Sequence, residues 1–319
     1  SGHDGASGPQ RPSRTVLVRW LLHVTRPVLS PLLGSTLCRT IDLLSGVSLF
    51  ALGAYAVASM GLAMTSGAPL PAIWPVLAVM AGLSILKAAL RYAEQFLGHL
   101  VAFKALELLR GQIFRSLIPR SPRVSATSRS GDLLSRATKD VDRIEVFFAH
   151  TFAPAVSAVI TPLVVLAVIG LKVSWLVALT VLPFVALQLL IVPRLGFTAS
   201  LEASRSSSAA RADLTQHVTD TVQGMSEVVG YGRSRERLDE MARIDAEIAG
   251  ASRPVGQWAS VRRGVNQMAS LTAPIAVVVV GAMLPTTGRG AGVPLLAAAA
   301  AAVLRMTETV RGVEELAGA

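Results

Sequence analysis

The chain has 319 residues, a net charge of +10, and 16% charged residues against 52% hydrophobic ones. Soluble domains usually have about a quarter of their residues charged, so this composition argues against a water-soluble core and favours a bundle in lipid. A basic protein raises the question of nucleic-acid binding, but no nucleic-acid motif is recognisable here. We therefore expect no nucleic-acid partner.

The first residues, 1–14, are polar and rich in Gly, Pro and Ser. This composition cannot bury enough apolar surface to fold, so we expect a disordered tail. Residues 15–319 are predicted to form one membrane domain. The single cysteine, Cys38, excludes an internal disulfide and a cysteine-based metal site, and we expect no metal site in the chain.

Six long apolar stretches follow the tail. Most reach the roughly 20 residues that cross a hydrocarbon core, and the fifth and sixth need flanking residues to do so. No stretch alternates with the period of two that a membrane β-strand shows, so helices must satisfy the backbone in lipid. The predicted fold is all-α with six transmembrane helices, at about residues 29–64, 73–90, 146–171, 175–195, 268–284 and 293–304.

The connections between these stretches alternate in length and charge. The two long linkers run roughly over residues 91–145 and 196–265. The segments Lys87–Arg143 and Arg194–Arg263, which largely coincide with them, contain eleven and ten Lys or Arg residues. The three short loops together hold only Lys172 and Arg289. Positive residues concentrate on the cytoplasmic side of membrane proteins. The charge therefore predicts a multi-pass protein of a bacterial plasma membrane with both termini and both linkers in the cytoplasm.

Both long linkers have helical character. Apolar residues recur at steps of three and four from Phe96 to Leu117 and again from Leu214 to Val229, and Leu238 follows the second series after a gap. Turn residues interrupt each pattern once, at Pro119–Pro122 and at Gly230–Gly232. The sequence thus predicts two long cytoplasmic helical hairpins, one after the second and one after the fourth membrane helix.

Several motifs sharpen this picture. The segment Arg91–Arg110 resembles an "RYxE…H…L…LR" stretch, Gly131–Asp142 resembles "G(D/E)LL(S/N)R…DVD", and Gln223–Gly230 resembles "QG…E…(F/Y)G". With the two hairpins, these stretches resemble the transmembrane domain of ABC exporters (type IV fold, also called the ABC transporter type 1 transmembrane domain), CydC-like branch. The resemblance covers about residues 15–319.

The resemblance implies a permease half that pairs with a second half-transporter, as homodimer or heterodimer, and exports a small molecule such as haem, a thiol, an amino acid or a peptide-like compound. It also implies an ATPase domain, in cis or in trans, that binds ATP and Mg²⁺. Within the 319 residues there is no G-x-x-x-x-G-K-[ST] loop to hold nucleotide phosphates. We expect the nucleotide-binding domain to lie outside this sequence.

Candidate pathway residues gather at the end of the second membrane helix. His99 has the chemistry of an iron ligand, and the resemblance implies a haem contact there; the alternative is a histidine hydrogen-bonded within the bundle. Charged residues near a membrane are costly unless paired, so they indicate either ion pairing or recognition of an anionic substrate. The predicted pathway set is Arg91, Tyr92, Glu94, Gln95, His99 and His150; Lys87 and Asp42 are further ionisable residues in apolar stretches.

The resemblance places short coupling helices at the hairpin tips, where they contact the ATPase domain. The residues that it implies for coupling are Pro122, Val124, Ser125, Gly131, Asp132, Gln223, Gly224, Glu227 and Gly230. Asp132, Asp140 and Asp142 are interleaved with basic residues, so helical i,i+4 pairing explains them better than catalysis. No catalytic constellation is readable, and a non-transporting membrane scaffold or sensor is the alternative to a transporter.

Overall fold

The structure is a computed structural model that describes residues 29–117, 152–284 and 292–318. Every regular element in these ranges is a helix, as the absence of period-two patterning predicts. The chain divides into two compact units, one up to Val165 and one from Leu166 onward. Within these ranges, five helical segments are long and apolar enough to cross a membrane, one of them being Trp175–Gln223 taken as a whole, and the apolar part of a sixth, Val293–Thr307, is shorter.

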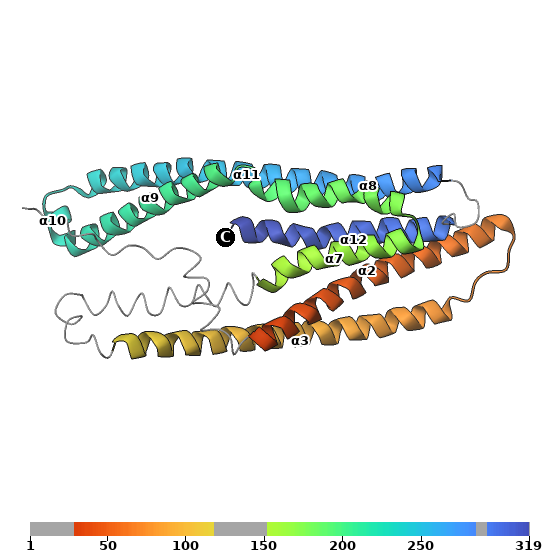
Figure 1. The fold of residues 1–319 in the computed structure, drawn as a ribbon. Coiled ribbons are helices and arrows are strands. Elements are labelled where there is room, and N and C mark those ends of the chain that lie inside the picture. Colours follow the sequence, from red (N-terminus) through yellow and green to blue (C-terminus); the bar gives the residue numbers. More distant parts are fainter. Residues whose placement is uncertain (1–28, 118–151, 285–291, 319) are drawn as a thin grey trace, which may run out of the picture. The chain divides into compact units, whose positions relative to one another are not determined.

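The first unit contains α2 (Leu29–Ser66), α3 (Trp74–Leu117) and the first part of α7 (Ala153–Lys172). Helices α2 and α3 pack against each other (Figure 1) and are joined by a turn in which Gly67 has a φ of +68°. Small residues allow the two helices to approach, as small residues do in lipid. The hydroxyl of Ser35 donates to the carbonyl of Glu94 at 3.2 Å.

Hydroxyl groups also join α2 to α7. Thr40 and Ser157 are both buried, and their hydroxyl oxygens lie 3.2 Å apart. Each hydroxyl also donates to a carbonyl four residues back in its own helix. This back-bonding satisfies a polar group without water, which is the condition for placing it inside an apolar bundle.

The second unit begins with the end of α7 and the turn into α8 (Trp175–Ala186). The extended residue Ser174 caps α8, because its hydroxyl accepts a hydrogen bond from the amide of Leu176 at 3.2 Å. After α8 the chain forms a π-helical turn, η5 (Leu187–Ile191), and a 3₁₀ turn, η6 (Val192–Arg194). The apolar stretch 175–195, predicted as one helix, is helical up to Arg194; its hydrogen-bond pattern changes at Leu187, and the helix is broken only at Leu195 and Gly196.

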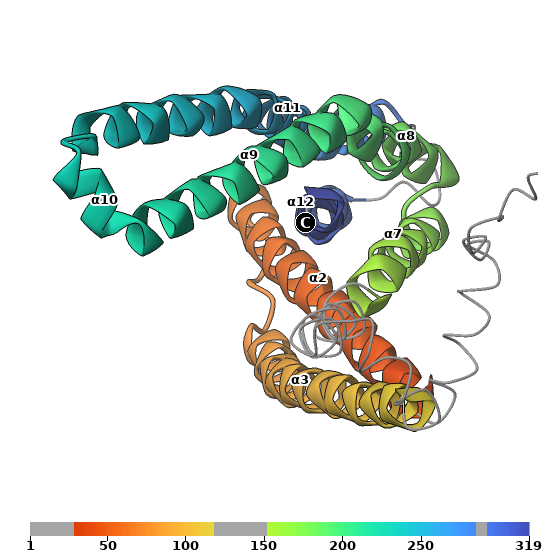
Figure 2. The ribbon, with the colours of Figure 1, turned by 90° about the vertical axis from the view of Figure 1, so that its left-hand side faces the viewer.

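A long helical hairpin follows the break. Helices α9 (Phe197–Gln223) and α11 (Ser234–Met283) run side by side and are joined by the short helix α10 (Met225–Gly230), as Figure 2 shows. The predicted turn at Gly230–Gly232 is confirmed, since α10 ends there and Gly232 has a φ of +68°. The other predicted turn, at Pro119–Pro122, lies outside the described residues.

Helix α11 continues from the hairpin into the predicted fifth membrane segment, where it packs on α12 (Val293–Gly318). Small or short side chains recur every four residues on its buried face, at Ala269, Ala273, Val277 and Gly281. A Cβ atom added to Gly281 would lie 2.3 Å from a methyl group of Leu296. Close approach of small residues is the usual basis of helix packing in lipid.

This packing predicts the effect of enlarging Ala273, which is fully buried. The Ala273→Leu variant overfills the contact and should lower the free energy of unfolding by about 1–3 kcal/mol. The measurement is the thermal unfolding midpoint in detergent. Ala282→Leu is the control, because Ala282 is an exposed residue of the same helix. Equal midpoints for both variants would contradict the packing described.

Candidate functional site

Five charged side chains form two neighbouring groups of ion pairs where α2 and α3 pack, and we refer to them together as the charged cluster. Lys87 Nζ lies 2.7 Å from Asp42 Oδ1, and it also reaches the carbonyl of Asp42 at 3.4 Å. Glu94 receives two guanidinium groups: Arg39 Nη1 lies 2.7 Å from Oε1, and Arg91 Nη1 lies 2.9 Å from Oε2. The cluster thus joins two carboxylates to three cations across the helix pair.

Burial explains why each carboxylate needs its partners. The side chains of Asp42 and Glu94 are only 3% and 8% exposed, and an ionised group away from water is costly unless it is paired and hydrogen-bonded. The cations are more exposed, and Arg91 is the most exposed of them at 53%. Because three cations meet two carboxylates, the cluster has an excess positive charge that an anion could neutralise.

Of the two interpretations left open for these charges, ion pairing is observed: Arg91 pairs with Glu94, three residues away on the same helix. Lys87 lies four residues before Arg91 on α3, but its ion pair is with Asp42 on α2. Arg39, which the sequence did not single out, also pairs with Glu94. The signal for its role is the spacing of three residues to Asp42, which puts both on the same side of α2.

Aromatic side chains line an exposed face of α3 beside this cluster. Tyr92 stacks on Phe96, with ring centres 6.5 Å apart and planes 16° apart, and His99 stacks on Phe103 at 6.2 Å and 25°. Tyr92, Gln95 and His99 are all exposed, in agreement with the predicted common face. The remaining pathway candidate, His150, lies outside the described residues. The face offers flat apolar surface next to positive charge.

The second candidate region is the tip of the α9–α11 hairpin. Gly224 ends α9, and its amide donates to the carbonyl of Asp220 at 2.9 Å before the chain turns into α10. The predicted coupling residues Gln223, Gly224, Glu227 and Gly230 are all brought together at this tip. The other predicted coupling residues, Pro122, Val124, Ser125, Gly131 and Asp132, lie outside the described residues.

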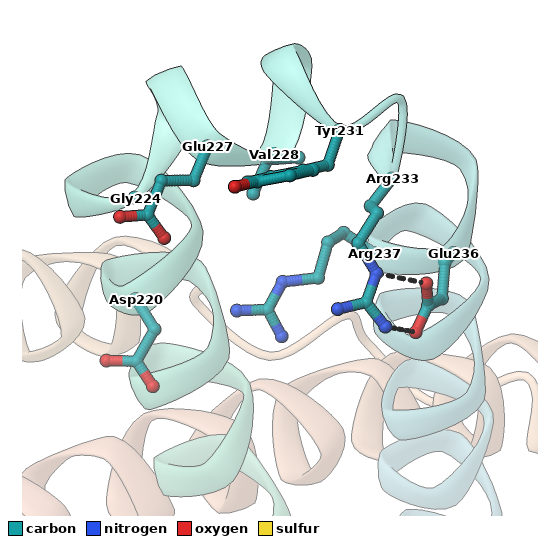
Figure 3. Close-up of a pocket in the computed structure, with 8 residues that line it drawn as sticks. All are labelled: Asp220, Gly224, Glu227, Val228, Tyr231, Arg233, Glu236 and Arg237. Atoms are coloured by element: carbon teal, nitrogen blue, oxygen red, sulfur yellow. Dashed lines mark hydrogen bonds and ion pairs between the residues drawn. The ribbon is translucent and has the colours of Figure 1, made fainter.

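The tip encloses a hollow of about 400 Å³ between α9, α10 and α11. Figure 3 shows Asp220 and Glu227 on one side and Arg233 and Arg237 on the other. The guanidinium of Arg233 forms a two-pronged pair with Glu236, at 2.8 and 2.7 Å. The hollow is therefore lined mainly by charged groups.

The ion pairs at the start of α11, both in the hollow and one to two turns beyond it, form between residues of that same helix end. The hydrogen bonds from Arg233, and next its charge, hold the pKa of Glu236 below its usual range. Arg243 likewise lowers the pKa of Glu240 through hydrogen bonding, and that contact raises the pKa of Arg243. Because all four groups are exposed, water and salt screen them, and the pairs define local geometry more than they stabilise the fold.

Exposed apolar side chains surround the charged hollow. They lie on the end of α9, on α10 and just after it, and include Val222, Met225, Val229 and Tyr231, which is 81% exposed. Apolar patches rimmed by polar groups are typical of surfaces that contact another protein. Within the part of the chain that the structure describes, no group of three His, Cys, Asp or Glu residues could hold a metal ion.

The sequence matches a family model described as "ABC transporter transmembrane region" over residues 39–297. It is 32% identical over 173 residues to a probable ABC transporter ATP-binding/permease protein of Haemophilus influenzae, covering 54% of this chain and 31% of the relative. It is 28% identical over 203 residues to the glutathione/L-cysteine transport system ATP-binding/permease protein CydC of Escherichia coli, covering 63% and 33%.

A further relative is the beta-(1→2)glucan export ATP-binding/permease protein NdvA of Bartonella quintana, 24% identical over 163 residues, with 51% of this chain and 27% of the relative covered. The chain spans no more than about a third of the length of these curated relatives. The similarity agrees with the resemblance that the motifs indicate.

The charged cluster predicts different costs for two equivalent substitutions. Lys87→Met leaves the carboxylate of Asp42 buried without its cation and should cost about 3–5 kcal/mol of unfolding free energy, measured in detergent. Adding Asp42→Leu should restore most of the loss. Lys104→Met is the matched control on the same helix: its pair with Glu107 has the same 2.7 Å length but is exposed, so the cost should stay below about 1 kcal/mol. Equal costs at both lysines would contradict the role given to burial.

Proposed function

The chain belongs to the ABC transporter transmembrane family, and from that premise we propose that it is the permease half of an ATP-driven ABC exporter. It forms a substrate pathway through the membrane and receives movement from an ATPase domain. The observation that carries the proposal is the hairpin of α9, α10 and α11, which ends in an exposed tip of apolar and charged residues. The relatives support it, since all those compared are named ATP-binding/permease proteins.

The required partners follow from this assignment. An ATPase domain, in cis or in trans, binds ATP and Mg²⁺ and contacts the tip at Gln223, Gly224, Glu227 and Gly230. A second half-transporter completes the pathway, either as another copy or as a different chain. The tip at Pro122, Val124, Ser125, Gly131 and Asp132 is proposed to contact the ATPase domain in the same way.

The chain is proposed to lie in a bacterial plasma membrane with both termini and both hairpins in the cytoplasm. The support is the charge distribution, because the hairpin segments have most of the Lys and Arg residues and the short loops have two. Helix lengths agree: α11 has 50 residues, about 75 Å, which is more than twice the ~30 Å of a hydrocarbon core.

The substrate is proposed to be a small anionic molecule with a flat or apolar part. The excess positive charge at Arg91 suits a carboxylate, and the exposed rings of Tyr92, Phe96 and Phe103 suit a planar or apolar group. Haem combines both properties, and His99 adds an imidazole that could bind its iron. A thiol-containing peptide remains the alternative, in view of the glutathione and L-cysteine named for the Escherichia coli relative.

Cross-linking tests the contact with the ATPase domain. In a Cys38→Ser background, a cysteine at Ser226 on α10 should cross-link to the ATPase domain in the assembled transporter. A cysteine at Ser206 is the control, because this exposed residue of α9 lies about 30 Å back along the hairpin and should give no cross-link. Equal yields at both positions, or none at Ser226, would favour the non-transporting scaffold or sensor.

Haem titration tests the substrate. Addition of haem to the purified protein should shift the Soret band, and His99→Ala should weaken binding roughly tenfold, which corresponds to about 1.4 kcal/mol. His217→Ala is the control, since His217 lies in the hairpin, where it contacts Arg237. An unchanged Soret band would remove haem and leave the thiol-containing peptide as the candidate.

A further inference from the structure

The fourth apolar segment breaks at a defined place. After α8 the backbone passes through the π-helical turn η5 and the 3₁₀ turn η6, becomes extended at Leu195 and left-handed at Gly196, with a φ of +65°. Pro193 lacks an amide donor within this stretch, and such residues interrupt helices. A break of this kind would act as a soft hinge if nothing else held it.

Helix α11 holds the break on its membrane side. The side-chain amide of Gln188, in η5, donates through Nε2 to the hydroxyl of Ser270 at 3.1 Å and to the backbone carbonyl of Asn266 at 3.3 Å. All three residues are buried. Polar contacts between helices in lipid are individually modest, at about 0.6 kcal/mol on average, but they fix the register of the two segments.

The same helix holds the other side of the break. The guanidinium of Arg262 is buried and donates through Nη1 to the carbonyl of Leu195 at 3.0 Å. This carbonyl belongs to the extended residue, which has left the helical hydrogen-bond pattern. A charged donor thus satisfies the acceptor that the break exposes.

Trp258 completes the contact. A Cβ atom added to Gly196 would lie 2.0 Å from the indole ring of Trp258, so no larger residue fits without moving the ring. The positive φ of Gly196 separately favours glycine. The indole therefore lies directly against the backbone at the point where α9 begins.

These four residues of α11 form a regular series. Trp258, Arg262, Asn266 and Ser270 are spaced four apart, along one ridge of the helix. Measured from Met283, Ser270 lies about 20 Å along α11 and Trp258 about 38 Å. An apolar core of about 30 Å ends between them, so the series straddles the level at which the helices leave the membrane.

We propose that this series is the element that transmits movement from the hairpin tip to the membrane segment α8, an inference that rests on the proposed function. Helix α9 extends about 40 Å from the break to the tip. A displacement of the tip reaches α8 only if the break does not bend. The contacts from α11 keep α8 and α9 moving as one body, and the four residues are positioning residues that touch no substrate.

The first experiment tests the contact itself. Gly196→Ala should destabilise the protein through both the positive φ and the collision with Trp258. Gly67→Ala is the matched control, because Gly67 has a φ of +68° with no atom within 4 Å of the added Cβ. In a Trp258→Ala background the cost of Gly196→Ala should fall to that of Gly67→Ala. Equal costs of Gly196→Ala with and without Trp258 would overturn the contact.

The second experiment tests transmission in the complete transporter, reconstituted with its ATPase domain. In a Cys38→Ser background, a cysteine at Lys172, the exposed last residue of α7 and three residues before α8, is labelled with a maleimide with and without ATP and Mg²⁺. ATP hydrolysis is measured in parallel. Trp258→Ala should reduce the ATP-dependent change in labelling rate about fivefold or more while hydrolysis continues. Trp258→Phe keeps an aromatic ring at this position and should restore the ATP-dependent change in labelling rate. A residue with a purely structural role would not be expected to show this recovery.

The outcomes separate the two claims. If Trp258→Ala and Gly196→Ala both retain the full ATP-dependent change, the series does not transmit movement and this inference is overturned, whereas the proposed function stands. If the unmodified transporter shows neither ATP hydrolysis nor an ATP-dependent change, the proposed function fails and the inference fails with it. Loss of the labelling response with retained hydrolysis in both variants supports transmission.

Discussion

Hydrocarbon offers no hydrogen bonds, so a polar group in the apolar part of this protein is costly unless the protein itself supplies a partner. The carboxylate of Asp42 takes Lys87, and that of Glu94 takes Arg39 and Arg91. Hydroxyl groups such as those of Thr40 and Ser157 bond to carbonyls of their own helices. These partners determine which helices pair, because a charged group can be buried only where its counterpart is present.

A related constraint acts at the break after α8, near the membrane boundary, where Gln188 and Arg262 are buried within the protein. A backbone carbonyl that leaves the helical pattern at Leu195 would be costly without a donor, and Arg262 supplies one. The side-chain amide of Gln188 is tied to α11 in the same manner. Contacts with α11 therefore stabilise the irregular segment, and the residues that make them, Arg262, Asn266 and Ser270, lie on one ridge of that helix.

Much of the fold could be predicted from the sequence because hydrophobic length and helical period are local signals. The helices at 29–66 and 74–117, and the turn at Gly230–Gly232, follow directly from them. The break at 187–196 could not be predicted in this way. Proline and glycine also occur in unbroken membrane helices, so Pro193 and Gly196 alone do not distinguish a break from a regular helix.

In the candidate sites, contacts within one helix could be predicted from the sequence, whereas contacts between helices could not. The spacing of Arg91 and Glu94 indicated their pair, since both lie on one helix. The partnership of Lys87 with Asp42 depends on which helices meet, and periodicity identifies the face of a helix but not its neighbour. For the same reason Trp258 and Arg262 looked like ordinary residues of a polar linker. Their contacts with the backbone of Leu195 and Gly196 can be recognised only in the structure.

One long helix in each unit joins several of the candidate site residues. In the first unit, α3 has Lys87, Arg91 and Glu94 together with the aromatic face at Tyr92 and His99. In the second, α11 begins with the charged residues of the tip and continues through Trp258 to the residues that pack on α12. Helix α11 is continuous from Ser234 to Met283, although Pro254 and Pro274 each remove one backbone hydrogen bond, and a displacement at one end is proposed to be carried along its length. Side-chain contacts are needed only where the neighbouring helix is broken, and that is where Trp258 and Arg262 lie.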